Sequence, residues 1–246
     1  MKNFQKARKT LEFVFGTKHP NIATSYYFIG LVYINMGDYD RAIKFSQKAM
    51  RIYERVLGPN SPNTAVLYTS IGEANRMKGK YDLSLKYYQE AKIVFETVLG
   101  QENLYTAISY NGLGEAYRKK GQYDLSMEYH EKARLIRERL QGLMHPDTAL
   151  SYNNIGMVYS DKGDSNQALK YFRMALKIQE KKLGNNHPST ALSYNNIGMV
   201  YFNKCKYECS LELLNKAFEI WKEKFGENNP STKMAKHNIE LVKSNI

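Results

Sequence analysis

Glycine recurs along this chain at a fixed interval of 42 residues, and this repetition restricts the possible folds more than any other feature of the sequence. One column of glycines comprises Gly30, Gly72, Gly114, Gly156 and Gly198, and a second comprises Gly58, Gly100, Gly142, Gly184 and Gly226. Proline keeps the same interval at Pro20, Pro62, Pro146, Pro188 and Pro230, with Leu104 in the place of the missing proline. An internal period of about 20 to 50 residues is typical of a solenoid, in which copies of one small unit stack on each other.

Each unit carries the signals of two consecutive helices. In residues 146–187, Pro146 opens an apolar pattern with helical spacing, and Gly163 follows its end. Proline costs no hydrogen bond in the first turn, and glycine accepts the left-handed conformation that ends a helix. A second helical pattern runs from Ala168 to Leu183 and ends at Gly184. The sequence therefore predicts an all-α fold built from antiparallel helix hairpins.

The repeat divides the chain into full and partial units. The full units are residues 20–58, 62–100, 104–142, 146–184 and 188–226. Residues 1–16 match a second helix whose first helix is missing, which indicates a fragment of a longer array, with a naturally shorter half-unit as the alternative. Residues 230–246 match a first helix with added polar side chains, which predicts a C-terminal capping helix.

A glycine stands in the middle of the first helix of every full unit, where it costs about 1 kcal/mol relative to alanine. Small residues recur in the second helix at Ala42, Ser84, Ser126, Ala168 and Ser210. We therefore expect the two helices of a hairpin to approach closely at these positions. Another small column, expected to admit the next unit, comprises Ala49, Ala91, Ala133, Ala175 and Ala217.

The pattern within one unit resembles a known repeat. The segment from Tyr152 to Tyr159, with sequence YNNIGMVY, is followed by Lys162-Gly163 and by small and aromatic positions in the second helix. This pattern resembles the tetratricopeptide repeat, and the length of 42 residues with the linker 183–188 is similar to the units of the kinesin light chain family. The resemblance implies a right-handed superhelical solenoid whose first helices line a concave face and hold partner peptides.

Asparagines gather on the first helices. The resemblance implies that Asn154 and Asn196 hold the backbone of an extended peptide, because an amide side chain both donates and accepts hydrogen bonds. The neighbouring column contains Asn111, Asn153 and Asn195, which are also candidate groove residues. In the alternative interpretation these side chains bond along and between neighbouring helices.

Two arginines, Arg76 and Arg118, occupy one column of the first helices a repeat apart. A guanidinium group suits a carboxylate ligand. The same arginines follow Glu73 and Glu115 by three residues, so intrahelical ion pairs are the alternative.

Three further residues complete the candidate peptide-binding set. Met157 and Met199 occupy a groove column three residues before the positions that are equivalent to Arg76 and Arg118. Arg137 matches a basic groove position of the kinesin light chain family, whose groove recognises tryptophan flanked by acidic residues. The column of Ile108, Leu150 and Leu192 is apolar where that family can have lysine, so this chain departs from the family pattern.

No sequence motif indicates catalysis, a cofactor or a metal. Three histidines, His19, His145 and His187, repeat one linker position before proline, which favours a structural role over a metal cluster. Cys205 and Cys209 are the only cysteines, so free thiols and a reducing compartment are expected. No apolar run is long enough to span a membrane. We therefore expect a cytoplasmic, non-enzymatic protein without a cofactor.

The chain is basic, with 36 Lys and Arg against 24 Asp and Glu and a formal net charge of +12. This charge suits an acidic partner or nucleic acid. Nucleic acid is the less favoured, because no basic run is interleaved with exposed aromatic residues. The leading hypothesis is a protein-interaction scaffold that binds an extended, acidic peptide or partner segment in the concave groove. The alternatives are a self-associating structural array that forms a homo-oligomer, and a basic nucleic-acid-binding surface.

Overall fold

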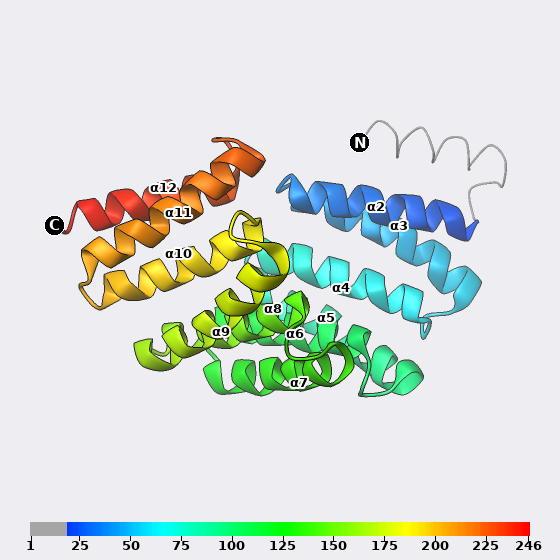
Figure 1. Ribbon diagram of the computed structural model, residues 1–246. Helices are drawn as coiled ribbons and strands as arrows, with labels where there is room; N and C mark the ends of the chain where they lie inside the picture. The colour runs from blue at the N-terminus through cyan, green and yellow to red at the C-terminus, as the bar shows by residue number, and fades with distance from the viewer. Residues whose placement is uncertain (1–18) are drawn as a thin grey trace. The chain divides into compact units, whose positions relative to one another are not determined.

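The computed structural model describes residues 19–246, which form eleven α-helices and no β-strand. Contacts divide the described residues into two compact units, of which the first ends at Ile136 and the second begins at Arg137. The first contains α2 (Pro20–Asn35), α3 (Tyr39–Leu57), α4 (Pro62–Met77), α5 (Tyr81–Leu99), α6 (Leu104–Lys119) and most of α7 (Tyr123–Gln141). The second contains the end of α7, α8 (Pro146–Asp161), α9 (Ser165–Leu183), α10 (Pro188–Asn203), α11 (Tyr207–Phe225) and α12 (Pro230–Lys243) (Figure 1). The helix predicted for residues 1–16 lies outside the described residues.

Consecutive helices pair as antiparallel hairpins within each unit (Figure 1). In the first unit α2 pairs with α3 and α4 with α5, and in the second α8 pairs with α9 and α10 with α11. The second helix of one hairpin also packs on the first helix of the next, as α3 does on α4 and α9 does on α10. Stacking buries the faces that a single hairpin leaves exposed. The prediction of an all-α array of helix hairpins is confirmed for the described residues.

Every first helix begins with the same side-chain cap. The capping residues are His19, Ser61, Asn103, His145, His187 and Asn229, and each accepts a hydrogen bond at 2.9–3.3 Å from the backbone N–H two residues later. Such a cap satisfies one of the amides that a helix start leaves without a partner. The structural role predicted for the three linker histidines is therefore that of helix caps.

The second helices end at glycines, and each of these glycines is hydrogen-bonded to the start of the next 42-residue repeat. The residues Gly58, Gly100, Gly142, Gly184 and Gly226 have φ between 81° and 89°. Six residues later, a threonine hydroxyl donates a hydrogen bond of 2.8–3.0 Å to the glycine carbonyl. These threonines are Thr64, Thr106, Thr148, Thr190 and Thr232. Each hydrogen bond fixes where one hairpin follows the previous one.

A second set of hydrogen bonds also joins neighbouring hairpins. In four of the repeats, a tyrosine of the first helix donates a hydrogen bond to a glutamate fourteen residues earlier, on the second helix of the preceding repeat. The pairs are Tyr68–Glu54 at 3.4 Å, Tyr110–Glu96 at 2.5 Å, Tyr152–Glu138 at 2.6 Å and Tyr194–Glu180 at 2.8 Å. Burial, together with Glu180, raises the pKa of Tyr194 to about 12. The hydroxyl therefore stays a donor across the physiological pH range.

Glycines in the middle of the first helices allow large side chains of the second helices to reach them. A Cβ atom at Gly156 would lie 2.6 Å from the ring of Phe172, and one at Gly114 would lie 2.7 Å from the ring of His130. The sequence predicted that the small column containing Ala168 would be opposite, and in the last hairpin Ser210 of that column does donate a 2.8 Å hydrogen bond to the Gly198 carbonyl. In the hairpins of Gly114 and Gly156 the nearest contact comes from the residue one turn later. A helical side chain leans over the turn before its own Cα. Ala168 therefore leaves room at the crossing, and the ring of Phe172 fills it.

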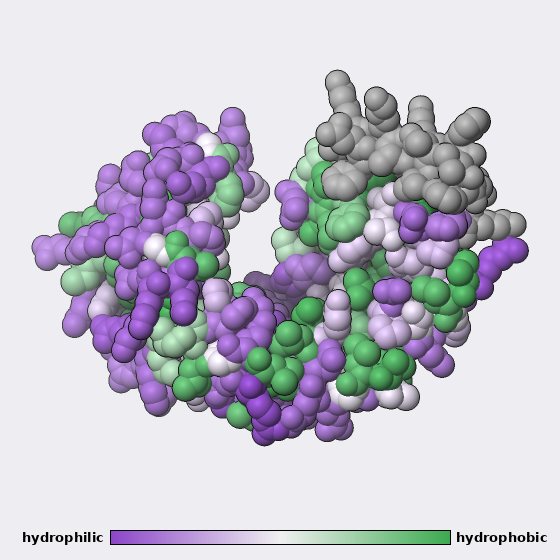
Figure 2. Space-filling model, turned by 45° about the vertical axis from the view of Figure 1, so that its right-hand side comes forward, coloured by the Kyte–Doolittle hydropathy of each residue, from purple (hydrophilic) through white to green (hydrophobic). Residues whose placement is uncertain are grey.

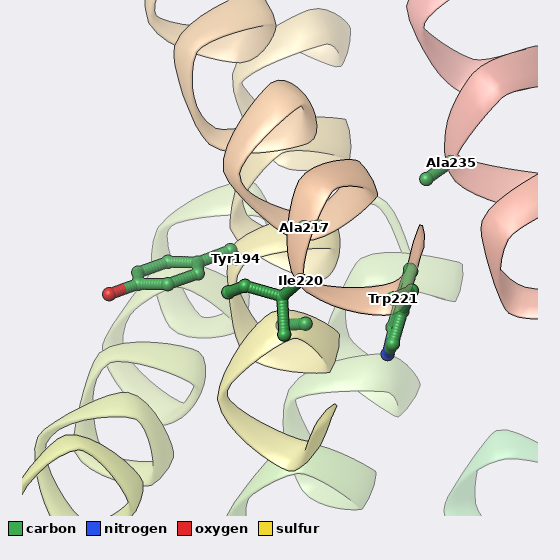
Figure 3. Packing of buried hydrophobic residues seen from close by; sticks show 6 residues of the cluster. Tyr194, Ala217, Ile220, Trp221 and Ala235 are labelled. Atoms are coloured by element: carbon green, nitrogen blue, oxygen red, sulfur yellow. The ribbon is translucent and has the colours of Figure 1, made fainter. Parts of the chain in front are cut away.

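The column of second-helix alanines is fully buried, as its members Ala49, Ala91, Ala133, Ala175 and Ala217 each have 0% exposure. Figure 3 shows the buried cluster around Ala217. Ala217, Ile220 and Trp221 lie on α11, Tyr194 lies on α10, and Ala235 lies on α12. The indole N–H of Trp221 donates a 3.1 Å hydrogen bond to the Pro188 carbonyl. The predicted contact of this alanine column with the next repeat is present here, because Ala217 and Ala235 belong to the same cluster.

One tight turn between the helices of a hairpin departs from the repeat. Glycine occupies this turn at Gly37, Gly79, Gly121 and Gly163, with φ between 74° and 83°. In the last hairpin Cys205 takes the place of glycine at φ 56°, a conformation that strains a residue with a side chain.

We expect Cys205→Gly to raise the free energy of unfolding by about 0.5–1 kcal/mol, because glycine removes the clash between Cβ and the backbone at positive φ. Urea denaturation followed by circular dichroism measures the change. Cys205→Ala is the control, since it removes the thiol but keeps Cβ. Equal stabilisation by both variants would show that the thiol, and not the backbone conformation, destabilises this turn.

Candidate functional site

The first helices of residues 137–246 place three asparagines in one column. Asn154 lies on α8, Asn196 on α10 and Asn238 on α12, and the column keeps the interval of 42 residues. Asn154 and Asn238 are half-buried, and Asn196 is 9% exposed. Asn238 was not among the predicted site residues, although the repeat interval points to it.

The neighbouring asparagines bond between helices. Asn153 is 1% exposed, and its amide N–H donates to the Ser193 hydroxyl at 3.0 Å. That hydroxyl also lies 2.6 Å from Oε1 of Gln179, to which it donates. Asn195 accepts a 2.9 Å hydrogen bond from the amide of Asn238. Asn153 and Asn195 therefore show the helix-to-helix bonding that was the alternative to ligand contact.

Apolar side chains flank the asparagine column on both sides. One turn before it lie Leu150 and Met234, which are 38% and 42% exposed, and the half-buried Leu192. Three residues after it lie Met157 and Met199, both half-buried. Met157 packs against the cluster that includes Phe172, and Met199 packs against the cluster of Leu214, Ile239 and Val242. Each first helix of this unit thus presents an apolar residue, an asparagine and a second apolar residue on one face.

In the first unit, the structure brings Arg76 and Arg118 into one charged cluster. Arg76 donates to Glu73 at 2.8 and 2.6 Å, and Arg118 donates to Glu115 at 3.3 and 3.2 Å. A third contact of 3.7 Å joins Arg76 to Glu115 across the repeat. Arg118 is 6% exposed. Both arginines thus form the intrahelical pairs weighed against ligand binding.

Two side chains that the sequence did not single out extend this cluster. Tyr88 donates a 2.9 Å hydrogen bond to Glu73, and Nε2 of the fully buried His130 lies 3.6 Å from Glu115. Burial by itself raises the pKa of Glu115, but Arg118, His130 and Arg76 outweigh it and hold this pKa below its ordinary value. Burial and the carboxylate of Glu73 raise the pKa of Tyr88 well above its ordinary value. Glu115 is therefore a half-buried anion kept ionised by its neighbours.

Arg137 is also held inside the protein. Its side chain is 6% exposed, and Nη1 donates to the Ser151 hydroxyl at 2.8 Å and to the Asp147 carbonyl at 3.3 Å. Burial lowers the pKa of this guanidinium group, and Asp147 opposes the shift. These contacts fix the start of α8 relative to the end of α7. Asn111 of α6 is half-buried in the first unit.

The described residues contain no group of three or more His, Cys, Asp and Glu side chains that could hold a metal ion. Cys205 and Cys209 are free and exposed. Within residues 19–246, every helix is too short or too polar to cross a membrane.

Comparison with known proteins identifies the repeat. Two family models, both described as tetratricopeptide repeat, match residues 22–96, 105–181 and 151–208 and residues 190–231. No curated protein sequence matches the chain.

Several solved structures share the fold. A kinesin light chain-type protein of Podosopora anserina with nearly identical TPR-like repeats is 20% identical, with a TM-score of 0.64, over 85% of this chain and 99% of that one. BtubC (BKLC) from P. vanneervenii is 18% identical, with a TM-score of 0.70, over 92% of this chain and 89% of that one. Aspartyl phosphate phosphatase F from Bacillus subtilis is 15% identical, with a TM-score of 0.67, over 98% of this chain and 64% of that one. Together with the family-model matches and the stacked hairpins, these likenesses show that the chain belongs to the tetratricopeptide repeat family.

Proposed function

We propose that this protein is an interaction scaffold that binds an extended segment of a partner protein on the first-helix face of residues 137–246. The observation that carries the proposal is the pair of Asn154 and Asn196 in one column between two columns of apolar side chains. An amide side chain has two donors and an acceptor, so it can pair with the N–H and C=O groups of a peptide whatever its sequence.

The apolar neighbours supply the second part of the binding surface. Leu150 and Met234 expose enough apolar area to cover ligand side chains, while Met157 and Met199 are flexible enough to adapt to them. Hydrogen bonds from the asparagines would fix the direction of the peptide, and apolar contacts would select side chains between them.

Several candidate residues whose side chains are hydrogen-bonded within the protein take a supporting role in this proposal. Asn153, Asn195 and Arg137 join neighbouring helices, and Arg118 holds Glu115 in the first unit. They therefore position the first helices, while contact with a ligand is assigned to the column of Asn154. Arg76 and Asn111 remain proposed contact residues of the first unit, each on its own first helix.

The proposal predicts that Asn154→Ala combined with Asn196→Ala weakens binding of a selected peptide by about tenfold or more, because two hydrogen bonds of about 1 kcal/mol each are lost. A peptide array identifies ligands of the parent chain, and fluorescence anisotropy with one labelled ligand gives the dissociation constants. The matched control is Asn185→Ala with Asn215→Ala, which removes two exposed amides elsewhere in the same unit.

Circular dichroism verifies that both variants keep the helical content of the parent. Loss of binding in the first variant and retention in the control support the groove. Equal affinity of both variants for the peptide would contradict it, and so would a parent chain that binds no peptide.

Self-association is the second candidate, and exposed apolar residues of the first unit favour it. Leu83 and Ile93 of α5 are 40% and 56% exposed, and Leu125 and Leu135 at the equivalent positions of α7 are 41% and 53% exposed. Figure 2 shows several hydrophobic areas among hydrophilic surface. A homo-oligomer would cover these residues. Light scattering at increasing concentration tests this, because a mass that stays at that of one chain excludes the oligomer.

We further propose the cytosol as the compartment, since both exposed thiols are free. The proposed activity is binding alone, and no catalytic residue is assigned.

A further inference from the structure

The outer face of α9 carries a stripe of cations. Lys170, Arg173, Lys177 and Lys181 are all exposed, and Met174 lies among them at 36% exposure. These residues are three, four, seven and eleven positions after the first, so they follow one side of the helix. The stripe belongs to a second helix and is separate from the first-helix face of the proposed peptide site.

The stripe borders an open hollow of about 480 Å³. Its lining residues are Asn166, Leu169, Lys170, Arg173, Met174 and Lys177. Leu169 and Met174 supply apolar surface, and the three cations and one amide surround it. No carboxylate contributes to this lining in the part of the chain that the structure describes.

The equivalent positions of the neighbouring repeats carry neutralised charge instead. On α7, Lys132 donates to Glu128 at 2.6 Å, and on α11, Lys216 donates to Glu212 at 2.7 Å. The repeat interval places Lys170 where these helices have glutamate, and Met174 where they have lysine. In α9 a cation thus replaces the anion of an ion pair, and an apolar side chain replaces its partner. Lysine also stands at this position as Lys44 of α3 and Lys86 of α5, so the feature peculiar to α9 is Met174 beside it.

The acidic residues at the two ends of α9 are engaged in the fold. Asp164 caps the helix by accepting from the backbone N–H of Gln167 at 3.0 Å, and Glu180 accepts from the hydroxyl of Tyr194 at 2.8 Å. Among residues 19–246, Lys170 and Lys177 have no ion-pair partner in the structure. The two lysines are thus without a direct carboxylate partner in this part of the chain, and Nζ of Lys170 lies 5.9 Å from the centre of the Tyr171 ring.

Contacts with α10 add to the charge and fix its position. Arg173 donates a 2.8 Å hydrogen bond to the hydroxyl of Tyr201, which holds the guanidinium group at the edge of the hollow. Lys204, at the end of α10, donates to Asn166 at 3.0 Å and brings a further cation beside the lining. The surface is thus partly ordered before any ligand arrives, which reduces the entropy lost on binding.

We propose that the outer face of α9 is a docking site for an acidic segment of a partner protein, in which carboxylates flank an apolar side chain. The carboxylates pair with Lys170 and Lys177, which are about 10 Å apart along the helix axis, and the apolar side chain covers Leu169 and Met174. Part of the net charge of +12 would then serve to bind an acidic partner. Arg76 and Arg118 of the first unit are already paired with glutamates of their own helices.

The test uses the full chain and a labelled peptide in which leucine is flanked on both sides by glutamates, with the glutamine version as the uncharged probe. Fluorescence anisotropy should show binding of the glutamate peptide that weakens as salt rises, because exposed ion pairs are screened. Lys170→Glu combined with Lys177→Glu should reduce its affinity by about tenfold or more. Lys132→Glu combined with Lys216→Glu makes the same change in net charge and should reduce it by less than about threefold.

The outcomes separate this site from the first-helix groove. The variant Asn154→Ala with Asn196→Ala should keep full affinity for the glutamate peptide, whereas its loss there would place acidic peptides in the groove and overturn the proposal. Equal losses in the two lysine variants would reduce the site to non-specific charge. A single-stranded RNA oligonucleotide that binds more tightly than the peptide, and is lost in the same Lys170 variant, would show that the partner is not a protein.

Discussion

Truncation of Phe172 to alanine should lower the free energy of unfolding of residues 137–246 by about 3–5 kcal/mol. The ring is fully buried and occupies the space that a Cβ atom at Gly156 would take. It also packs with Ile197 and Val200 of the next hairpin. Its removal leaves a cavity between two hairpins, and helices cannot close it because their remaining contacts hold them apart. This loss is a large fraction of the stability of an ordinary domain.

The matched control is Phe225→Ala at the end of α11, where the ring is 51% exposed. It makes the same truncation without a cavity, and we expect a loss below about 1 kcal/mol. Urea denaturation gives the free energies, and amide hydrogen exchange shows whether the loss falls on α8, α9 and α10. A cost for Phe172→Ala no larger than that of the control would mean that this ring does not hold the hairpins together.

Replacing Glu115 with glutamine should destabilise the first unit by about 3 kcal/mol at neutral pH. The carboxylate faces Arg118, Arg76 and His130, and its side chain is 17% exposed. Glutamine has a similar shape but no charge, so the buried guanidinium group of Arg118 loses its counter-ion. Glu128→Gln is the control, since Glu128 and its partner Lys132 are 52% and 46% exposed and such pairs contribute about 0–1 kcal/mol.

The difference between the parent and Glu115→Gln should depend on pH. The pKa of Glu115 in the folded chain lies below its ordinary value of 4.5, so the carboxylate stabilises the fold fully above that pH. As pH falls through the lowered pKa, the folded state takes up the proton and the stabilisation is lost. Denaturation midpoints of the two proteins should therefore converge below about pH 4.5, whereas a constant difference down to lower pH would show that the effect is steric.

The ends of the helices could be predicted from the sequence because their signals are local. Pro146 and Gly184 mark a helix start and a helix end through the conformations that these residues adopt on their own, and α8 and α9 keep these boundaries. Even Leu104, where proline is missing, begins a helix, because Asn103 supplies the cap. Local chemistry thus predicts the hairpins.

The partners of the mid-helix glycines and of the site asparagines could not be predicted in the same way. Phe172 is the residue that packs against Gly156, and this depends on the direction in which its side chain points where the two helices cross. Asn153 and Asn154 are adjacent in sequence, yet Asn153 is 1% exposed and bonds to Ser193 of the next hairpin. The difference arises only when two repeats are stacked, and the sequence of one repeat does not contain that geometry.

The junction between repeats has a consequence for how such a gene can change. Each described junction from Gly58 to Thr232 closes with the same threonine-to-glycine hydrogen bond, and four of them add the same tyrosine-to-glutamate pair. Loss or duplication of a whole repeat by unequal recombination therefore joins two ends that already carry matching partners. The chain can lengthen or shorten in steps of one hairpin while every junction stays closed, so repeats can be gained or lost without a new fold.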